Sequence, residues 1–166
     1  MAVKLPCGNR TCYLERLPER LVVDGYRYWM AGYQTGSIAP WELAWSLFAK
    51  ELGPTDGRTA LSALTCWVRT CRNWSPEPRQ FFPFACQRLC KDECLAVSLI
   101  AALQHGDGHC ADYCLGAMVM PDGLADTEQS AKDLAHSLNT LGQTLMPVPI
   151  TVIEDIASRP PREQFH

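Results

Sequence analysis

Apolar residues recur at intervals of three and four along most of this chain, and no stretch before residue 147 alternates apolar and polar residues as a half-buried β-strand does. Prolines and glycines interrupt the pattern at positions suited to helix ends. We therefore predict an all-α fold, a single-domain irregular bundle of five to six helices. The length of 166 residues suits one domain of this kind.

Three parts of the chain can be distinguished. We expect residues 1–17 to form a cysteine-containing loop segment, residues 18–146 to form the helical domain, and residues 147–166 to be an extended segment with a disordered tail. Residues 151–156 have room for one more helical turn or an edge segment. The expected helices of the domain cover residues 18–34, 40–52, 56–73, 85–104, 110–120 and 126–145.

Charge and hydropathy narrow the functional classes. Residues 1–95 carry twelve basic and nine acidic groups, whereas residues 96–166 carry three basic and nine acidic groups, and no dense basic cluster points to a nucleic-acid surface. No apolar run reaches the ~18 residues of a membrane-spanning helix, and the first residues lack the apolar core of a signal peptide. We therefore expect a cytoplasmic protein that binds neither nucleic acid nor membrane and keeps its thiols reduced.

Cysteine is the unusual component of the composition. The chain has nine cysteines, an odd number that intrachain disulfides cannot use completely. In a reducing compartment such an excess indicates metal binding, thiol redox chemistry, or the packing of a small apolar side chain in the core. The positions are Cys7, Cys12, Cys66, Cys71, Cys86, Cys90, Cys94, Cys110 and Cys114.

A candidate metal site lies between the third and fourth expected helices. Glu93 lies on the apolar face of helix 85–104, where a carboxylate is costly unless it is paired, hydrogen-bonded or bound to metal. A hairpin turning near Gln80 would bring Cys71 level with Cys90. The leading interpretation is that the cysteines pack in the core as small apolar side chains, and the alternative is a Zn or Cu(I) site. Its expected ligands are Cys71, Cys86, Cys90 and Glu93, with Cys66 and Cys94 as further candidates.

The four-residue cysteine spacing carries a resemblance. Cys86, Cys90 and Cys94, and again Cys110 and Cys114, stand four residues apart. This spacing resembles that of the cytosolic copper-storage helical bundles, whose helices carry C-x-x-x-C pairs, over residues 86–114. The resemblance implies soft thiolate binding and assigns no individual ligand. A hairpin of the fourth and fifth helices would hold Cys94 and Cys114 about 12 Å apart, which disfavours one four-thiolate site.

The N-terminal segment offers a different chemistry. Cys7 and Cys12 flank Arg10 in a turn-rich stretch, and a nearby positive charge makes a thiol more reactive. We therefore consider a thiol redox pair made of Cys7 and Cys12, against the alternative of two incidental thiols in an exposed loop.

The helix expected at residues 40–52 is apolar around most of its circumference. Such a helix is central in a fold or covered by a partner. We expect its tryptophans to lie in the core, with a helix-in-groove interaction face as the alternative. In the preceding helix, Gly25 and Gly32 share a face and predict a close helix crossing. Asp24 has the spacing of an ion pair with Arg20 and with Arg27.

No phosphate loop, dinucleotide-binding fingerprint, nucleophile elbow or paired CxxC motif occurs in the chain. We therefore expect a small cytosolic accessory or interaction protein without catalytic activity of its own. Its partner would be another protein or a second copy of the chain. The alternatives are a thiolate protein that stores, senses or delivers Zn or Cu(I), and a thiol redox protein.

Overall fold

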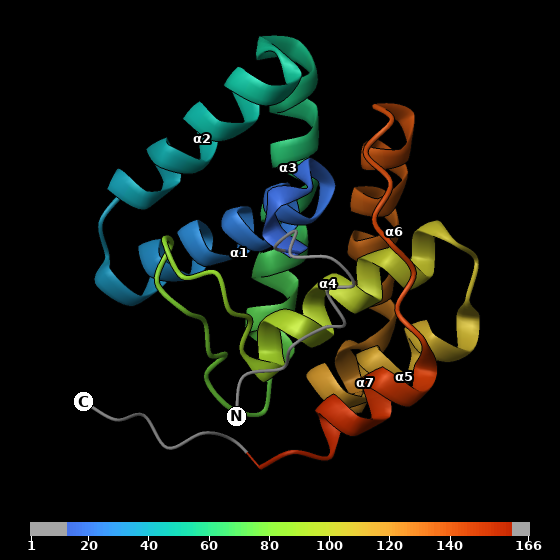
Figure 1. Cartoon of the computed structure of the whole chain (residues 1–166). Helices are drawn as coiled ribbons and strands as arrows, with labels where there is room; N and C mark the ends of the chain where they lie inside the picture. Colours follow the sequence, from blue (N-terminus) through green and yellow to red (C-terminus); the bar gives the residue numbers. More distant parts are fainter. Residues whose placement is uncertain (1–12, 161–166) are drawn as a thin grey trace.

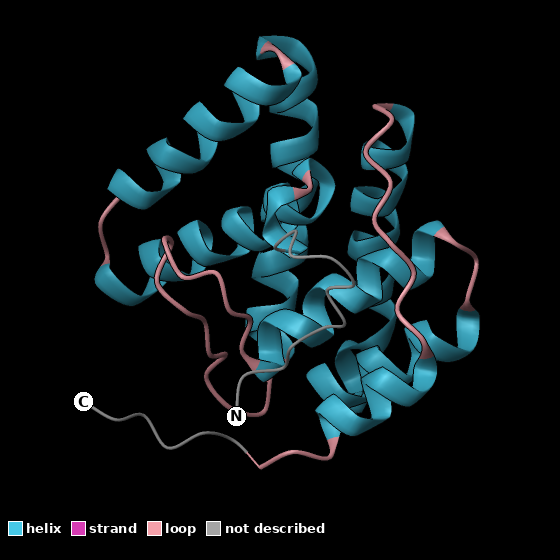
Figure 2. Cartoon of the chain, in the orientation of Figure 1, coloured by secondary structure: helices cyan, strands magenta, loops and turns pink. Residues whose placement is uncertain are grey.

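The computed structural model describes residues 13–160, and over this range the chain is helical with no strand (Figure 2). Its seven α-helices are α1 (Leu17–Thr35), α2 (Ala39–Leu52), α3 (Pro54–Trp74), α4 (Lys91–Gln104), α5 (Gly108–Met118), α6 (Leu124–Thr140) and α7 (Ile150–Ala157). The all-α prediction is confirmed, and one helix more is present because residues 150–157 form α7. None of the described helices is both long and apolar enough to cross a membrane.

Helix α4 lies at the centre of the molecule (Figure 1). Residues 93–102 are buried without exception, and α4 packs against α1, α5, α6 and α7. Nearly all of these residues are apolar, so the helix can face neighbours on every side. Ile153 and Ile156 of α7 are buried in the same core. The C-terminal segment therefore contributes a helix to the core, beyond the extended course expected for it.

Helix α4 begins at Lys91, six residues later than residue 85, where the sequence pattern places its start. Cys90 is the N-cap, and its backbone N–H donates to Glu93 Oε2 at 3.0 Å in a capping box. Residues 75–90 are therefore a long loop, and Cys86 lies in that loop. The predicted hairpin of the third and fourth helices is wrong, because α3 packs mainly against α2 and α6.

Helices α1, α2 and α3 enclose a triangle (Figure 1). The helices approach closely where glycines leave room. A Cβ on Gly32 would lie 2.1 Å from Trp41 Nε1, and a Cβ on Gly57 would lie 2.6 Å from the backbone oxygen of Phe48. A Cβ on Gly25 would likewise lie 2.6 Å from Leu64. The close crossing predicted at Gly25 and Gly32 is confirmed.

Helix α2 is peripheral, although it is apolar on most sides. Ala44 and Phe48 are its buried residues, and both point into the core. Trp41 and Trp45 are half-buried, and Leu43 is 53% exposed. The expectation that the tryptophans of this helix lie in the core is therefore wrong, because α2 contacts only α1 and α3 among its helix neighbours with substantial packing.

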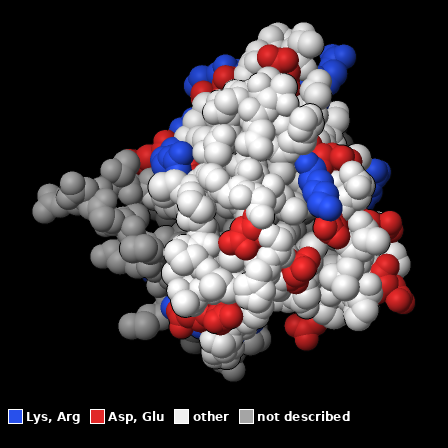
Figure 3. Space-filling view, turned by 90° about the vertical axis from the view of Figure 1, so that its right-hand side faces the viewer, with Lys and Arg blue, Asp and Glu red and all other residues white. Residues whose placement is uncertain are grey.

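The side of the molecule away from α2, formed by α5, α6 and α7, is acidic. Helices α5, α6 and α7 together carry six acidic residues and one basic residue, Lys132. Figure 3 views the side toward α5 and α6, and acidic side chains outnumber basic ones in the lower half of that view. The molecule therefore has an acidic α5–α7 side, and Figure 1 shows α2 and α6 on opposite sides of α3.

Candidate functional site

A buried ion pair holds Glu93, the carboxylate of the candidate metal site. Arg27 of α1 donates to Glu93 of α4 through Nε to Oε1 at 2.8 Å and through Nη2 to Oε2 at 3.0 Å. The side chains are 1% and 0% exposed. The bidentate geometry and the opposite charge compensate the desolvation that makes an isolated buried carboxylate costly. Glu93 is therefore accommodated by pairing.

The pair also binds the loop of residues 75–90. Glu93 accepts hydrogen bonds from the backbone N–H groups of Phe82 and Cys90, at 2.7 and 3.0 Å. The remaining donors of Arg27 reach the backbone oxygens of Phe84, Cys86 and Arg88 at 3.3, 2.7 and 2.6 Å. The loop is thus held against α1 and α4 by polar contacts. Both carboxylate oxygens of Glu93, which the candidate metal site would need as ligands, therefore accept hydrogen bonds in this network.

The ion pairs predicted within the first helix are replaced by longer-range ones. Arg20 donates to Glu51 of α2 at 3.1 Å, and Arg27 forms its ion pair with Glu93. Asp24 is 5% exposed, and burial raises its pKa to about 6, against the attraction of Arg27 and Arg20. The signal for the true partner of Arg27 was the isolated carboxylate on the apolar face of α4.

The predicted thiolate ligands are distributed over separate environments. Cys71 is buried in α3, Cys86 is half-buried in the loop, and Cys94 is buried in α4. Cys90 Sγ points to the backbone oxygen of Gln80 at 3.4 Å. Among residues 13–160, no group of three or more His, Cys, Asp or Glu side chains is arranged to hold a metal ion. The set of Cys71, Cys86, Cys90 and Glu93 is therefore not assembled as a ligand sphere.

The buried thiols are poor nucleophiles. Burial raises the pKa of Cys71, Cys94 and Cys114 to about 12, so each remains a neutral thiol at physiological pH. Cys66 differs, because it is exposed on α3 and Arg69 Nη2 lies 3.8 Å from its Sγ. The redox pair predicted at Cys7 and Cys12 lies outside the described residues and stays a prediction.

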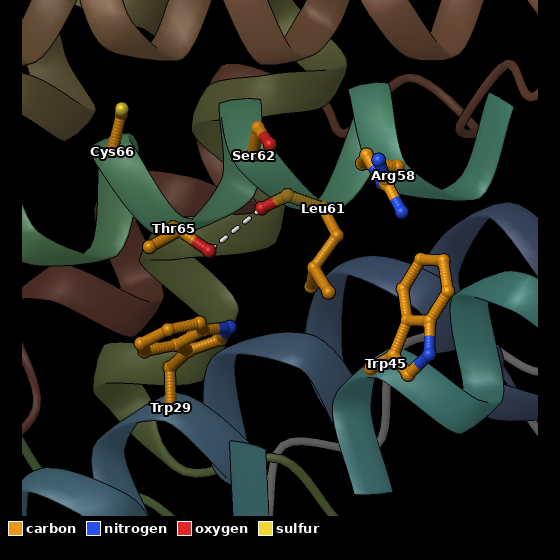
Figure 4. Close-up of a pocket in the computed structure, with 7 residues that line it drawn as sticks. All are labelled: Trp29, Trp45, Arg58, Leu61, Ser62, Thr65 and Cys66. Carbon is orange, nitrogen blue, oxygen red and sulfur yellow. Dashed lines mark hydrogen bonds between the residues drawn. The ribbon is translucent and has the colours of Figure 1, made fainter. Parts of the chain in front are cut away.

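A groove opens inside the triangle of α1, α2 and α3 (Figure 4). Its volume is about 460 Å³. Trp29 of α1 and Trp45 of α2 stand on either side, and Leu61 of α3 points between them. We call this feature the tryptophan groove. It is lined by Trp29, Trp45, Arg58, Leu61, Ser62, Thr65 and Cys66.

The groove is suited to binding and offers little for catalysis. The Thr65 hydroxyl donates a hydrogen bond to the backbone oxygen of Leu61 at 2.7 Å (Figure 4). No histidine or carboxylate is among the lining residues, so Ser62 and Cys66 have no general base within the groove. What remains is a mostly aromatic and aliphatic surface with an arginine at its mouth.

An aromatic cluster continues the groove toward the start of α2. The rings of Trp29 and Trp41 stack with centroids 4.6 Å apart, and Trp41 Nε1 donates to the backbone oxygen of Trp29 at 3.2 Å. Tyr33 meets the edge of Trp41 at 5.4 Å. These contacts fix the orientation of three large rings that remain half-buried.

Arginines border this aromatic surface. Arg58 lies over the Trp45 ring at 5.9 Å, and Arg72 lies over the Tyr33 ring at 4.5 Å. Sequence reasoning identified α2 as a possible interaction face and missed the contributions of Trp29 and Arg58. The spacing of the arginines in α3 was the available signal, since positions 58, 69 and 72 fall on one side of a helix at 100° per residue.

No protein-family model, no curated protein and no solved structure matches this chain.

Proposed function

We propose that this chain is a non-catalytic protein-interaction module that receives a partner protein in the tryptophan groove. The proposal rests on one observation: α2 is apolar on most sides, yet it lies at the periphery with Trp41 and Trp45 half-buried. A helix of this composition is stable in water when it is central or covered. Because α2 is not central in this fold, we infer that a partner protein covers its apolar surface.

The composition of the surface supports the proposal. Tryptophan, tyrosine and arginine are the residues that contribute most to protein–protein affinity. The groove and its aromatic continuation combine all three, in Trp29, Trp45, Tyr33 and Arg58. The stacked and edge-on contacts hold the rings in place before binding, which lowers the entropy cost of association.

Photo-crosslinking tests the proposed role. A photoreactive phenylalanine analogue replaces Ser62, an exposed residue that lines the groove, in the full chain expressed in its native cells. The same analogue at Lys132, exposed on α6, is the matched control. We expect one discrete adduct with another protein from position 62 and none from position 132, with the partner identified by mass spectrometry.

The purified partner then gives the quantitative test. Trp45→Ala should weaken its affinity at least tenfold, or about 1.4 kcal/mol, because the variant removes a ring from the groove wall. Lys132→Ala should leave the affinity unchanged, and thermal unfolding checks that both variants are folded. Adducts from both positions, adducts only with a second copy, or an affinity insensitive to Trp45 would contradict the role.

A further inference from the structure

We propose that the occupant of the tryptophan groove is an amphipathic helix of a partner protein, with acidic side chains beside its apolar ridge. This inference rests on the proposed function and specifies the chemistry of the partner.

The walls of the groove favour a helical occupant. All lining residues come from α1, α2 and α3, and the described chain contains no strand whose edge could extend into a partner. Recognition by strand addition is therefore excluded for this surface, and a groove between helices receives apolar side chains spaced at i, i+3, i+4 and i+7. Leu61 at the floor, with Trp29 and Trp45 at the sides, offers the matching apolar contacts (Figure 4).

The charge of α3 selects acidic neighbours for that apolar ridge. Arg58, Arg69 and Arg72 are exposed and share one side of α3, spread over about 21 Å of helix. The acidic residue of α3 is Asp56, in the first turn. A partner helix lying along α3 would therefore meet guanidinium groups at both ends of the groove, where carboxylates form short, charge-assisted hydrogen bonds.

Five of the nine arginines in residues 13–160 lie within 4 Å of a carboxylate, and the four that do not are Arg88 and the three arginines of α3. Arg16, Arg20, Arg27 and Arg79 each lie within 4 Å of a carboxylate. Within residues 13–160, no carboxylate lies within that distance of the three arginines of α3. Arg58 and Arg72 rest on aromatic rings instead. Their charge is thus available to a partner, and it is already held at the border of the groove.

A second copy of the chain is a weaker match. Its acidic α5–α7 side would complement the arginines of α3, but such a contact joins two different surfaces. Each added copy would leave one free surface of each kind, so the contact would continue into an open assembly unless the rotation closed a ring. The groove is therefore assigned to a different protein, and self-association is an outcome of the test.

Selection from a peptide library tests the occupant. A display library of helix-forming peptides with randomised surface positions is selected on the full chain and, in parallel, on the variant carrying Arg58→Glu and Arg69→Glu. We expect the natural chain to enrich apolar residues at i, i+4 and i+7 flanked by Asp and Glu. The variant should enrich the same apolar spacing flanked by Lys and Arg.

Fluorescence anisotropy with the best acidic peptide supplies the magnitude. The double charge reversal should weaken its binding at least tenfold, whereas Lys132→Glu, a charge reversal on α6, should change it less than twofold. Enriched peptides without acidic bias, extended or proline-rich peptides, no enrichment, or an assembly of the chain that the double variant abolishes would each overturn the proposal. If crosslinking from position 62 still captures a partner sensitive to Trp45→Ala, the interaction role stands and the acidic helix falls.

Discussion

Arg27 and Glu93 contact five backbone groups and each other, although 66 residues separate them in the chain. Burying one charge without the other would leave an uncompensated ion in a medium of low polarity. The pair therefore works as a unit that fixes the loop of residues 75–90. Its polar partners are backbone groups, so the contact depends on the path of the loop and only weakly on the loop's side chains.

Glu93→Gln removes one charge of this unit and leaves Arg27 buried. We expect the free energy of unfolding, measured by urea titration, to fall by about 3–5 kcal/mol. Glu128→Gln is the matched control, because Glu128 forms an exposed pair with Lys132, and its loss should cost less than about 1 kcal/mol. Equal effects of the two substitutions would show that the buried pair adds no stability beyond a surface pair.

Burial should determine how fast each cysteine thiol reacts with a thiol reagent. In a background carrying Cys7→Ser and Cys12→Ser, we expect an aromatic disulfide reagent to modify exposed Cys66 first and half-buried Cys86 more slowly. The five buried cysteines should react only after unfolding, since burial keeps them neutral and out of contact with the reagent. Cys66→Ser should remove the fast phase. Rapid modification of three or more thiols in the folded chain would contradict this assignment.

At the scale of elements, α2 is defined by its two crossings. It meets α1 where Gly32 admits Trp41, and it meets α3 where Gly57 admits the backbone of Phe48. Between these crossings the helices diverge, and the tryptophan groove occupies the space between them. The position of α2, and with it the shape of the groove, therefore depends on two residues without side chains.

Gly57→Ala should open the α2–α3 crossing. The added Cβ would lie 2.6 Å from the Phe48 oxygen, which is backbone and cannot rotate away. We expect the free energy of unfolding to fall by about 1–3 kcal/mol. Gly116→Ala is the control within α5, because nothing lies within 4 Å of its added Cβ, and it should raise stability by up to about 1 kcal/mol. If Gly57→Ala raised the free energy of unfolding, the α2–α3 crossing would have room for the added methyl group, contrary to this prediction.

At the scale of the whole molecule, buried Asp24 makes global stability depend on pH. Burial raises its pKa from 3.8 to about 6 in the folded state, so the folded form binds the proton more tightly than the unfolded form does. The contribution of this group to the free energy of unfolding is therefore greatest below pH 4. It declines as the pH rises to about 6 and is constant above that range.

Asp24→Asn replaces the carboxyl by a neutral group of the same shape. We expect the variant and the natural chain to be similarly stable near pH 4, and the variant to gain up to about 3 kcal/mol by pH 7. Urea unfolding at a series of pH values measures the difference. A constant offset between the two curves would show that Asp24 does not titrate in this window.

The distribution of charge also belongs to the whole molecule. Helices α5 to α7 carry six acidic residues and one basic residue, while the arginines of α3, which form no ion pair within residues 13–160, border the groove. The two sides differ in what they attract at a distance, because opposite charges steer diffusing partners before contact. An acidic helix would thus be drawn to the groove and repelled from the other side.

Local periodicity was enough to predict the all-α class and the glycine-lined crossing of the first helix. These features depend on residues three to seven positions apart, which share a helix face wherever the helix lies. The partner of Glu93 and the start of α4 at Lys91 required the folded chain. The peripheral position of α2 also required the folded chain, because a helix that is apolar on most sides can either be central in the fold or lie at the surface under a partner. Each depends on which distant segments meet, and helix periodicity carries no information about that.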